Sequence, residues 1–265
     1  MRRLALAAVA LVAVSTAAAA QSPQSKRFYL ALGDSQAYGV QPGKIGQPPA
    51  KFDTGYVDIV AARLRALNPA LKVVNYSCPG ESTVTFARGG CTWLAEGRKL
   101  HNPFRGSQLR AALAFLKAHR GQVSPITFTL WGNDIVPAFD SCPPKNFRAC
   151  VGTRAPKVIA DFAARFGSIL RQLREAAPTA RIVVTGPWNF DPDQPELTTP
   201  LWHPLLVAMR RESTGARATF VDLLPAFNRS KARLCAYSFI CSAGDPHPTD
   251  AGYRAIAAAI LRALA

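Results

Sequence analysis

The chain has 265 residues, of which 49% are hydrophobic and only 18% are charged, and such a chain buries enough surface to exclude intrinsic disorder. Its 18 glycines follow no three-residue period and its 21 prolines punctuate the whole sequence, which excludes collagen-like and coiled-coil fibres. The length fits one α/β domain, and a formal net charge of +16 predicts a strongly basic surface.

The beginning of the chain has the features of a secretory signal peptide. Two arginines give it a positive start, residues 4–14 form a short apolar run, and residues 18–20 are the small residues that signal peptidase prefers. The run is too short to span a bilayer comfortably, and no later stretch of about eighteen apolar residues follows. We therefore expect a secreted protein (extracellular or periplasmic) without a transmembrane segment, with a signal peptide at 1–20 and one domain over 21–265.

Strand-like and helix-like segments alternate along the rest of the chain. The strand-like segments are short and apolar, and the helix-like segments repeat apolar residues every three or four positions. We expect strands at residues 28–32, 71–76, 126–131, 181–185 and 219–223. We expect helices at residues 56–67, 109–119, 157–176, 201–209 and 251–264. This alternation predicts right-handed crossovers and a five-stranded parallel sheet with helices on both faces.

In a sheet of this kind, ligands bind where loops leave the carboxyl ends of the strands. Ser35 follows the first strand directly, and serine is a poor nucleophile unless a positioned base takes its proton. Of the four histidines, His247 is the best candidate, because two flanking prolines stiffen the loop that carries it. Asp245 is close enough to accept from the imidazole and to fix its tautomer. A turn that caps the last helix explains the same residues, and the two roles can coexist.

A serine nucleophile also needs hydrogen-bond donors for the oxyanion that forms during attack. Gly80 follows the second strand, and its lack of a Cβ lets its N–H approach a substrate oxygen closely. Asn133 follows the third strand and offers a side-chain amide. The backbone N–H of Ser35 would be a third donor. Taken singly, the glycine and the asparagine are also ordinary turn residues.

Six cysteines form three close couples, although six cysteines allow fifteen pairings. We expect nearest neighbours to pair, because each couple brackets a short loop. The expected disulfides are Cys78–Cys91, Cys142–Cys150 and Cys235–Cys241. Zinc binding is disfavoured because no C-x₂-C and no H-x₃-H spacing occurs. We expect neither a metal nor a cofactor.

Taken together, these residues resemble the SGNH/GDSL hydrolase family. Its four sequence blocks occur in order as Gly33-Asp34-Ser35, Asn75 with Gly80, Gly132-Asn133-Asp134, and Asp245 with His247-Pro248. The resemblance implies a flavodoxin-like three-layer sandwich with strand order 2-1-3-4-5. It also implies a nucleophile at Ser35, a base at His247, and an oxyanion hole formed by Ser35, Gly80 and Asn133. The three cysteine couples are similar to those of the secreted actinobacterial esterases and lipases.

The last block departs from the family pattern. The family usually has Asp-x-x-His, whereas Asp245 stands only two residues before His247 and Gly244 occupies the usual place. Either a tighter loop still brings Asp245 to the imidazole, or a backbone carbonyl orients the ring. We favour Asp245, because an ionised partner stabilises an imidazolium better than a carbonyl does.

The substrate is expected to bind between three loops, at residues 41–54, 134–151 and 189–204. The apolar residues near the site that can accept an acyl chain are Trp131, Ile135, Phe139, Trp188 and Phe190. These features favour a secreted serine esterase or lipase acting on acyl lipids or medium-chain esters. The alternatives are a carbohydrate acetyl esterase of the same fold and a catalytically silent protein that binds carbohydrate or lipid. We expect a monomer.

The basic residues are scattered along the chain rather than clustered, which favours a solubilising surface over a docking site. Attraction to anionic membranes or acidic polysaccharides is the alternative. No basic motif interleaved with aromatic residues and no zinc module occurs, so we expect no nucleic-acid partner.

Overall fold

The computed structural model describes residues 26–193 and 195–265, and the expected signal peptide lies outside them. The strands are β1 (Phe28–Gly33), β2 (Lys72–Asn75), β3 (Val123–Thr129), β4 (Ile182–Thr185) and β5 (Thr219–Val221). Every neighbouring pair is parallel, and the strand order is β2-β1-β3-β4-β5. The predicted sheet and its order are therefore confirmed.

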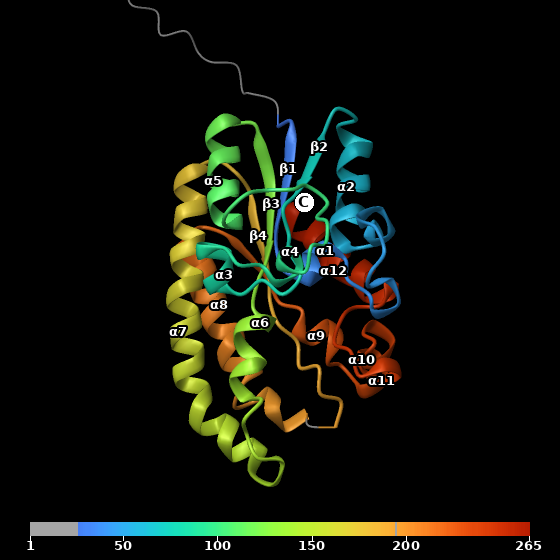
Figure 1. Cartoon of the computed structure of the whole chain (residues 1–265), viewed down its shortest axis with the longest axis vertical. Helices are drawn as coiled ribbons and strands as arrows, with labels where there is room; N and C mark the ends of the chain where they lie inside the picture. The colour runs from blue at the N-terminus through green and yellow to red at the C-terminus, as the bar shows by residue number, and fades with distance from the viewer. Residues whose placement is uncertain (1–25, 194) are drawn as a thin grey trace, which may run out of the picture.

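Helices cover both faces of this sheet. The α-helices are α1 (Ser35–Tyr38), α2 (Tyr56–Leu67), α3 (Thr83–Arg88), α4 (Thr92–Ala95), α5 (Gln108–Ala118), α6 (Gly132–Ile135), α7 (Phe147–Ala176), α8 (Trp202–Gly215), α9 (Leu224–Phe227), α10 (Lys231–Tyr237), α11 (Ile240–Ala243) and α12 (Asp250–Leu264). Figure 1 shows α3, α5, α7 and α8 on one side of the sheet and α2 and α12 on the other. This arrangement is the three-layer α/β sandwich that the sequence predicts.

Burial explains why these segments form these elements. All six residues of β1 and all four of β4 are buried, as expected for parallel strands between two helical layers. In α2 the buried residues Val57, Val60 and Ala61 recur at helical spacing and face the core. On the opposite face, the rings of Phe128 in β3 and Phe166 in α7 stack with centroids 5.5 Å apart.

The helix expected at residues 157–176 begins ten residues earlier, at Phe147 in α7. Gly152 and Pro156 lie in this added part, and their low helix propensity explains the late predicted start. The buried side chains of Val151 and Ala155 extend the apolar stripe of α7 into the core. Tertiary packing therefore outweighs the local propensity of this segment.

Other differences concern element ends and short helices. Strand β3 begins three residues before the predicted strand and ends at Thr129, and α8 continues past residue 209 to Gly215. The loop expected at 134–151 is largely helical, because it contains the end of α6, two 3₁₀ turns and the start of α7. The short helices α3, α4, α9, α10 and α11 were not predicted, since fewer than two turns leave little periodicity to read.

All three expected disulfides are present, Cys78–Cys91, Cys142–Cys150 and Cys235–Cys241. They close segments of 13, 8 and 6 residues, and each such loop contributes about 2–3 kcal/mol in the chain-entropy model. Within the described ranges, no helix combines the length and the apolar character needed to cross a bilayer.

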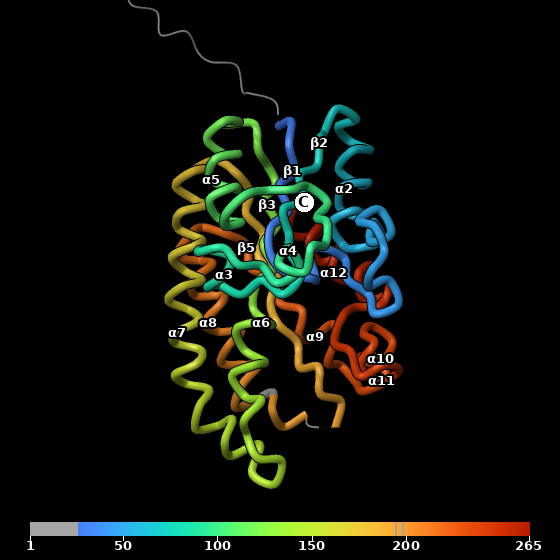
Figure 2. Tube along the Cα trace, in the orientation of Figure 1, coloured from blue at the N-terminus to red at the C-terminus, as the bar shows by residue number. Residues whose placement is uncertain are grey.

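The fold brings the two ends of the expected domain together. In Figure 2 the blue segment that follows β1 lies beside the red segment that leads into α12. Tyr253 in α12 donates from its hydroxyl to the carbonyl of Val40 at 2.8 Å, and the Gln41 side chain donates to Asp250 at 2.8 Å. These contacts join the chain after Ser35 to the chain after His247.

Candidate active site

Ser35 is positioned by a tight turn at the carboxyl end of β1. Gly33 has a φ of +130°, and a Cβ there would lie 1.8 Å from the carbonyl oxygen of Thr129, so only glycine fits. The Asp34 N–H donates to that carbonyl at 3.0 Å. The Asp34 carboxylate then caps α1 by accepting from the Gln36 N–H at 3.0 Å. The turn therefore presents Ser35 as the first residue of α1.

His247 lies in the segment between α11 and α12. Its carbonyl accepts from the Phe239 N–H at 3.0 Å, and Ser238 and Pro248 form an isolated antiparallel bridge. The Cys235–Cys241 disulfide joins α10 to α11, which are the helices that this segment contacts. Besides the two prolines, a bridge and a disulfide therefore hold the histidine in place.

The structure brings the three predicted catalytic side chains together. His247 Nε2 lies 2.8 Å from Ser35 Oγ, and His247 Nδ1 lies 2.7 Å from Asp245 Oδ1. The same carboxylate oxygen accepts from the His247 backbone N–H at 2.8 Å. Of the two partners considered from the sequence, the imidazole contacts the carboxylate rather than a backbone carbonyl. The two-residue spacing suffices because one oxygen serves both the backbone and the ring.

Electrostatics differ between the two carboxyls of this region. Burial favours a higher pKa for Asp245, but its hydrogen bonds to His247 and the charge of that ring outweigh burial, so its pKa lies below the ordinary value. Asp245 is therefore ionised where it faces the imidazole. Burial raises the pKa of Asp34 to about 7, in spite of the Gln36 hydrogen bond and the nearby His247.

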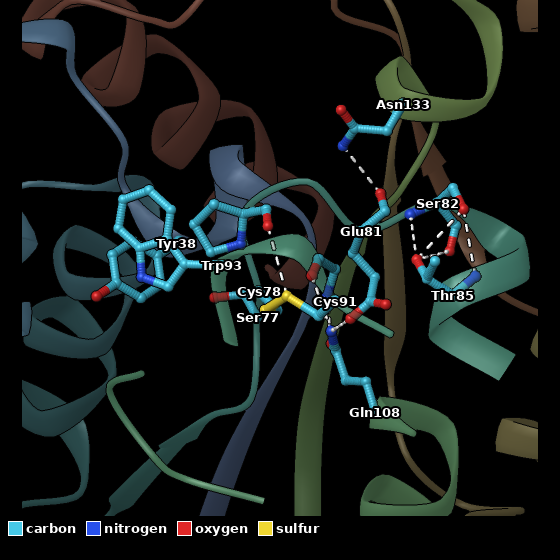
Figure 3. The surroundings of a disulfide bond; sticks show 12 residues. Tyr38, Ser77, Cys78, Glu81, Ser82, Thr85, Cys91, Trp93, Gln108 and Asn133 are labelled. Carbon is cyan, nitrogen blue, oxygen red and sulfur yellow. Dashed lines mark hydrogen bonds between the residues drawn. A yellow bond between two sulfur atoms is a disulfide. The ribbon is translucent and has the colours of Figure 1, made fainter. Parts of the chain in front are cut away.

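The two predicted oxyanion donors line the same pocket as Ser35 and His247. Gly80 has a φ of +85°, and a Cβ there would approach the Thr92 side chain to 3.2 Å. Asn133 uses one side-chain N–H to donate to the Glu81 carbonyl at 2.9 Å, as Figure 3 shows. Its second N–H is not used in that bond, since an amide nitrogen carries two hydrogens. The loops after β1, β2 and β3 thus converge on one site.

The sequence profile of the GDSL-like lipase/acylhydrolase family matches residues 31–255. This match covers most of the chain and all four sequence blocks. The chain belongs to the GDSL-like lipase/acylhydrolase family. The family resemblance inferred from the sequence is therefore confirmed, and carboxylic-ester hydrolysis is the chemistry that membership implies.

Solved structures of other proteins have the same fold as this chain. An extracellular lipase from Streptomyces rimosus is 15% identical, with a TM-score of 0.60, over 89% of this chain and 99% of the lipase. An acetylxylan esterase from Geobacillus stearothermophilus is 18% identical, with a TM-score of 0.58, over 91% of this chain and 95% of that one. An α/β hydrolase from a Lake Arreo metagenome is 22% identical, with a TM-score of 0.55, over 91% and 95%. No curated protein matches the chain significantly. At these identities the likeness establishes the fold alone.

The pocket that contains Ser35 has a volume of about 590 Å³. One part of its lining is apolar and comprises Trp131, Val136, Pro137, Trp188 and Phe190. Another part comes from the segment around α4 and comprises Thr92, Trp93, Glu96 and Arg98. Each of the three expected loops contributes to the lining, but the α4 segment was not predicted.

Two of the five apolar residues expected at the pocket lie elsewhere. Ile135 is fully buried in the core, and Phe139 lines a separate cavity near Cys142. Ile135 ends the single-turn helix α6, whose Gly132 and Asn133 line the pocket, whereas the Ile135 side chain packs in the core. Trp131, Trp188 and Phe190 do line the pocket, as expected.

Sequence reasoning missed two buried polar residues beside the site, Glu81 and Gln108. Glu81 is 1% exposed and Gln108 is fully buried, and burial raises the pKa of Glu81 to about 7. Glu81 directly follows Gly80, whereas Gln108 is the first residue of α5 and lies far from every family block. Nothing in the local sequence distinguishes such residues from the exposed Glu and Gln of an ordinary helix or loop.

Among the described residues, the donor atoms of Cys78, Glu81 and Cys91 come within 4.8 Å of one another, as a metal site would require. Both sulfurs belong to the Cys78–Cys91 disulfide, so neither is the thiolate that binds a metal. This group therefore does not fit a resident metal ion.

Proposed function

We propose that this protein is a secreted, monomeric serine hydrolase that cleaves carboxylic esters through an acyl-enzyme on Ser35. The observation that carries the proposal is the 2.8 Å contact between Ser35 Oγ and His247 Nε2, with Asp245 on the other ring nitrogen. An activated serine requires this order of nucleophile, base and orienting carboxylate. Membership in the GDSL-like family supports the same chemistry.

In the first half-reaction, Ser35 Oγ attacks the ester carbonyl carbon while its proton passes to His247 Nε2. The carbonyl π electrons move to oxygen, and the N–H groups of Ser35 and Gly80 and the Asn133 amide donate to that oxyanion. When the intermediate collapses, the bond to the alcohol breaks and His247 protonates the departing oxygen. The products are free alcohol and an ester of Ser35.

In the second half-reaction, water attacks the acyl-enzyme and gives its proton to the same imidazole. Collapse of this intermediate breaks the bond to Ser35 Oγ, which recovers the proton, and the acid is released. Asp245 stabilises the imidazolium that forms in both steps, because its carboxylate is ionised and 2.7 Å from Nδ1.

For the substrate, we propose acyl lipids or other esters with a medium-length chain. An acetyl group would leave most of a pocket of about 590 Å³ unfilled, whereas a longer chain can cover Trp131, Trp188 and Phe190. The fold is shared with a lipase and with an acetylxylan esterase, so the fold does not favour one of them. The apolar lining favours the longer chain.

The test is a panel of p-nitrophenyl esters from acetate to palmitate, together with labelling by a fluorophosphonate probe. We expect labelling of the wild type, a maximum of kcat/KM at medium chain length, and loss of both reactions in Ser35→Ala. Ser35→Ala should reduce kcat by about 10⁴-fold or more while leaving the thermal transition nearly unchanged. Ester hydrolysis retained in that variant would refute the serine assignment, and an inert wild type would favour a silent binding protein.

A further inference from the structure

The turn before Ser35 is bound by the side chain of Gln108, a residue outside the four family sequence blocks. Gly33 N–H donates to Gln108 Oε1 at 2.7 Å, and Gln108 Nε2 donates to the Gly33 carbonyl at 3.0 Å. The side-chain amide of Gln108 thus satisfies both polar groups of a residue two positions before the nucleophile. Because Gln108 begins α5, this pair ties the end of β1 to a helix of the neighbouring layer.

Glu81 fixes the orientation of that amide. Its Oε2 accepts the second N–H of Gln108 Nε2 at 2.9 Å. Gly33 N–H needs an acceptor and Glu81 is an acceptor, so the two ends of the Gln108 amide cannot be exchanged. In Figure 3 the Glu81 and Gln108 side chains point toward one another beside the Cys78–Cys91 disulfide.

The backbone of Glu81 reaches the third loop of the site. Its carbonyl accepts from Asn133 Nδ2 at 2.9 Å, and its neighbour in the chain is Gly80. One residue is therefore linked to the nucleophile turn through its side chain and to both oxyanion-hole loops through its backbone.

We propose that Glu81 and Gln108 are positioning residues, which hold the nucleophile turn in register with the two loops of the oxyanion hole. The inference rests on the proposed function, because it assigns these residues to the same reaction. Neither residue lines the pocket, so neither is a catalytic residue.

Burial indicates that this carboxyl is not explained by stability. Glu81 is 1% exposed, and a buried carboxyl is expected to destabilise a fold relative to an apolar residue of similar shape even when it accepts a hydrogen bond. Sites where a sequence departs from the most stable choice are commonly functional ones. Burial also raises the pKa of Glu81 to about 7, in agreement with this unfavourable environment.

The first test compares Glu81→Leu, which removes the contact to Gln108, with Glu81→Gln, which keeps one oxygen to accept that N–H. We expect Glu81→Leu to lower kcat by about 10²-fold with KM little changed, because a small misplacement of reacting groups has effects of this size. The rate of fluorophosphonate labelling should fall in parallel. Glu81→Gln should recover most of both rates.

The matched control is Thr127→Val. Thr127 Oγ1 in β3 and Tyr29 OH in β1 form a buried hydrogen bond of 2.9 Å, and neither residue lines the pocket. We expect this variant to lower Tm while its kcat stays at the wild-type value. If kcat follows Tm across all variants, or if Glu81→Leu keeps the wild-type kcat, the positioning role is overturned.

A charge swap keeps the test informative if Glu81→Leu fails to fold. Gln108→Glu places two carboxyls against each other and also removes the N–H that donates to the Gly33 carbonyl, whereas adding Glu81→Gln restores only the amide–carboxyl pair between the two side chains. We expect the double variant to exceed Gln108→Glu in kcat, and the absence of this rescue overturns the inference. A wild type that neither cleaves esters nor reacts with the probe refutes the proposed function itself, whereas an active wild type with unimpaired variants refutes only this inference.

Discussion

The nucleophile and the base are held by two different kinds of structure. Ser35 follows a buried strand, and the turn before it is fixed by the sheet through Thr129 and by α5 through Gln108. His247 lies at the periphery with a side chain that is 22% exposed, and its segment is held by a disulfide-linked pair of short helices. The sheet therefore positions Ser35, whereas the disulfide-linked helices α10 and α11 position His247. The three predictions below separate these two contributions.

The largest effect is expected where the base meets its carboxylate. Asp245 Oδ1 accepts from both the ring and the backbone of His247, so the backbone N–H holds that oxygen in place. Asp245→Asn should keep the oxygen there and lose only the charge, with a fall in kcat of about 10- to 10²-fold, since bonds to charged groups contribute about 1.5–3 kcal/mol. Asp245→Ala should lose both and fall further, by about 10³-fold.

Steady-state kinetics with one p-nitrophenyl ester measures this order. Neither variant should move Ser35, which the sheet holds. An unchanged Tm is the control that the fold around Ser35 is intact. Equal kcat values for the two variants would mean that charge rather than the shared oxygen orients the imidazole.

An intermediate effect is expected from the disulfides. We compare two double variants, Cys235→Ser with Cys241→Ser and Cys142→Ser with Cys150→Ser. Each variant removes one disulfide, and the two disulfides close segments of similar length, 6 and 8 residues. Both pairs of replacements should lower the free energy of unfolding by about 2 kcal/mol. Only the first should lower kcat, by about tenfold, because it loosens the segment that carries His247.

Denaturant unfolding and kcat measured on both proteins check this expectation. The Cys142–Cys150 variant is the matched control, since its disulfide anchors the start of α7 rather than the base. A similar loss of kcat in both variants would argue against a specific role of the Cys235–Cys241 disulfide in positioning His247.

The smallest effect is expected in the pH dependence of stability. The pKa of Asp34 is raised to about 7, so its favourable contribution is complete below pH about 4 and is lost as pH rises through 7. The pKa of Asp245 is lowered, so its contribution is present at neutral pH and is lost as the solution becomes acidic. The contribution of Asp34, beside the nucleophile, should therefore fall toward high pH, and that of Asp245, beside the histidine, should fall toward low pH.

Thermal unfolding of the wild type and Asp34→Asn at pH 5 and pH 8 tests this contrast. We expect the variant to gain several degrees in Tm relative to the wild type at pH 8 and little at pH 5, because asparagine can still cap α1 but carries no charge. A gain of the same size at both pH values would show that ionisation of Asp34 is not the cause.

The sequence predicted the sheet well because its strands are short, apolar and regularly spaced between helices. It predicted the start of α7 poorly, since Gly152 and Pro156 have low helix propensity and only the packing of Val151 and Ala155 reveals the helix. Ile135 and Phe139 were placed at the pocket because their order along the chain does not show which way a short helix turns its side chains.

The sequence by itself determined the strand order through the family blocks, the pairing of the cysteines through their spacing, and the identity of Ser35, His247 and Asp245 as candidates. These features depend on residues that are near one another in the chain or that recur in a fixed order. The tertiary structure decided which atom faces the imidazole and how Glu81 and Gln108 support the turn before Ser35. The Glu81–Gln108 and Gln108–Gly33 contacts join residues 27 and 75 positions apart, and local sequence carries no signal for them because the sheet brings these residues together only after folding.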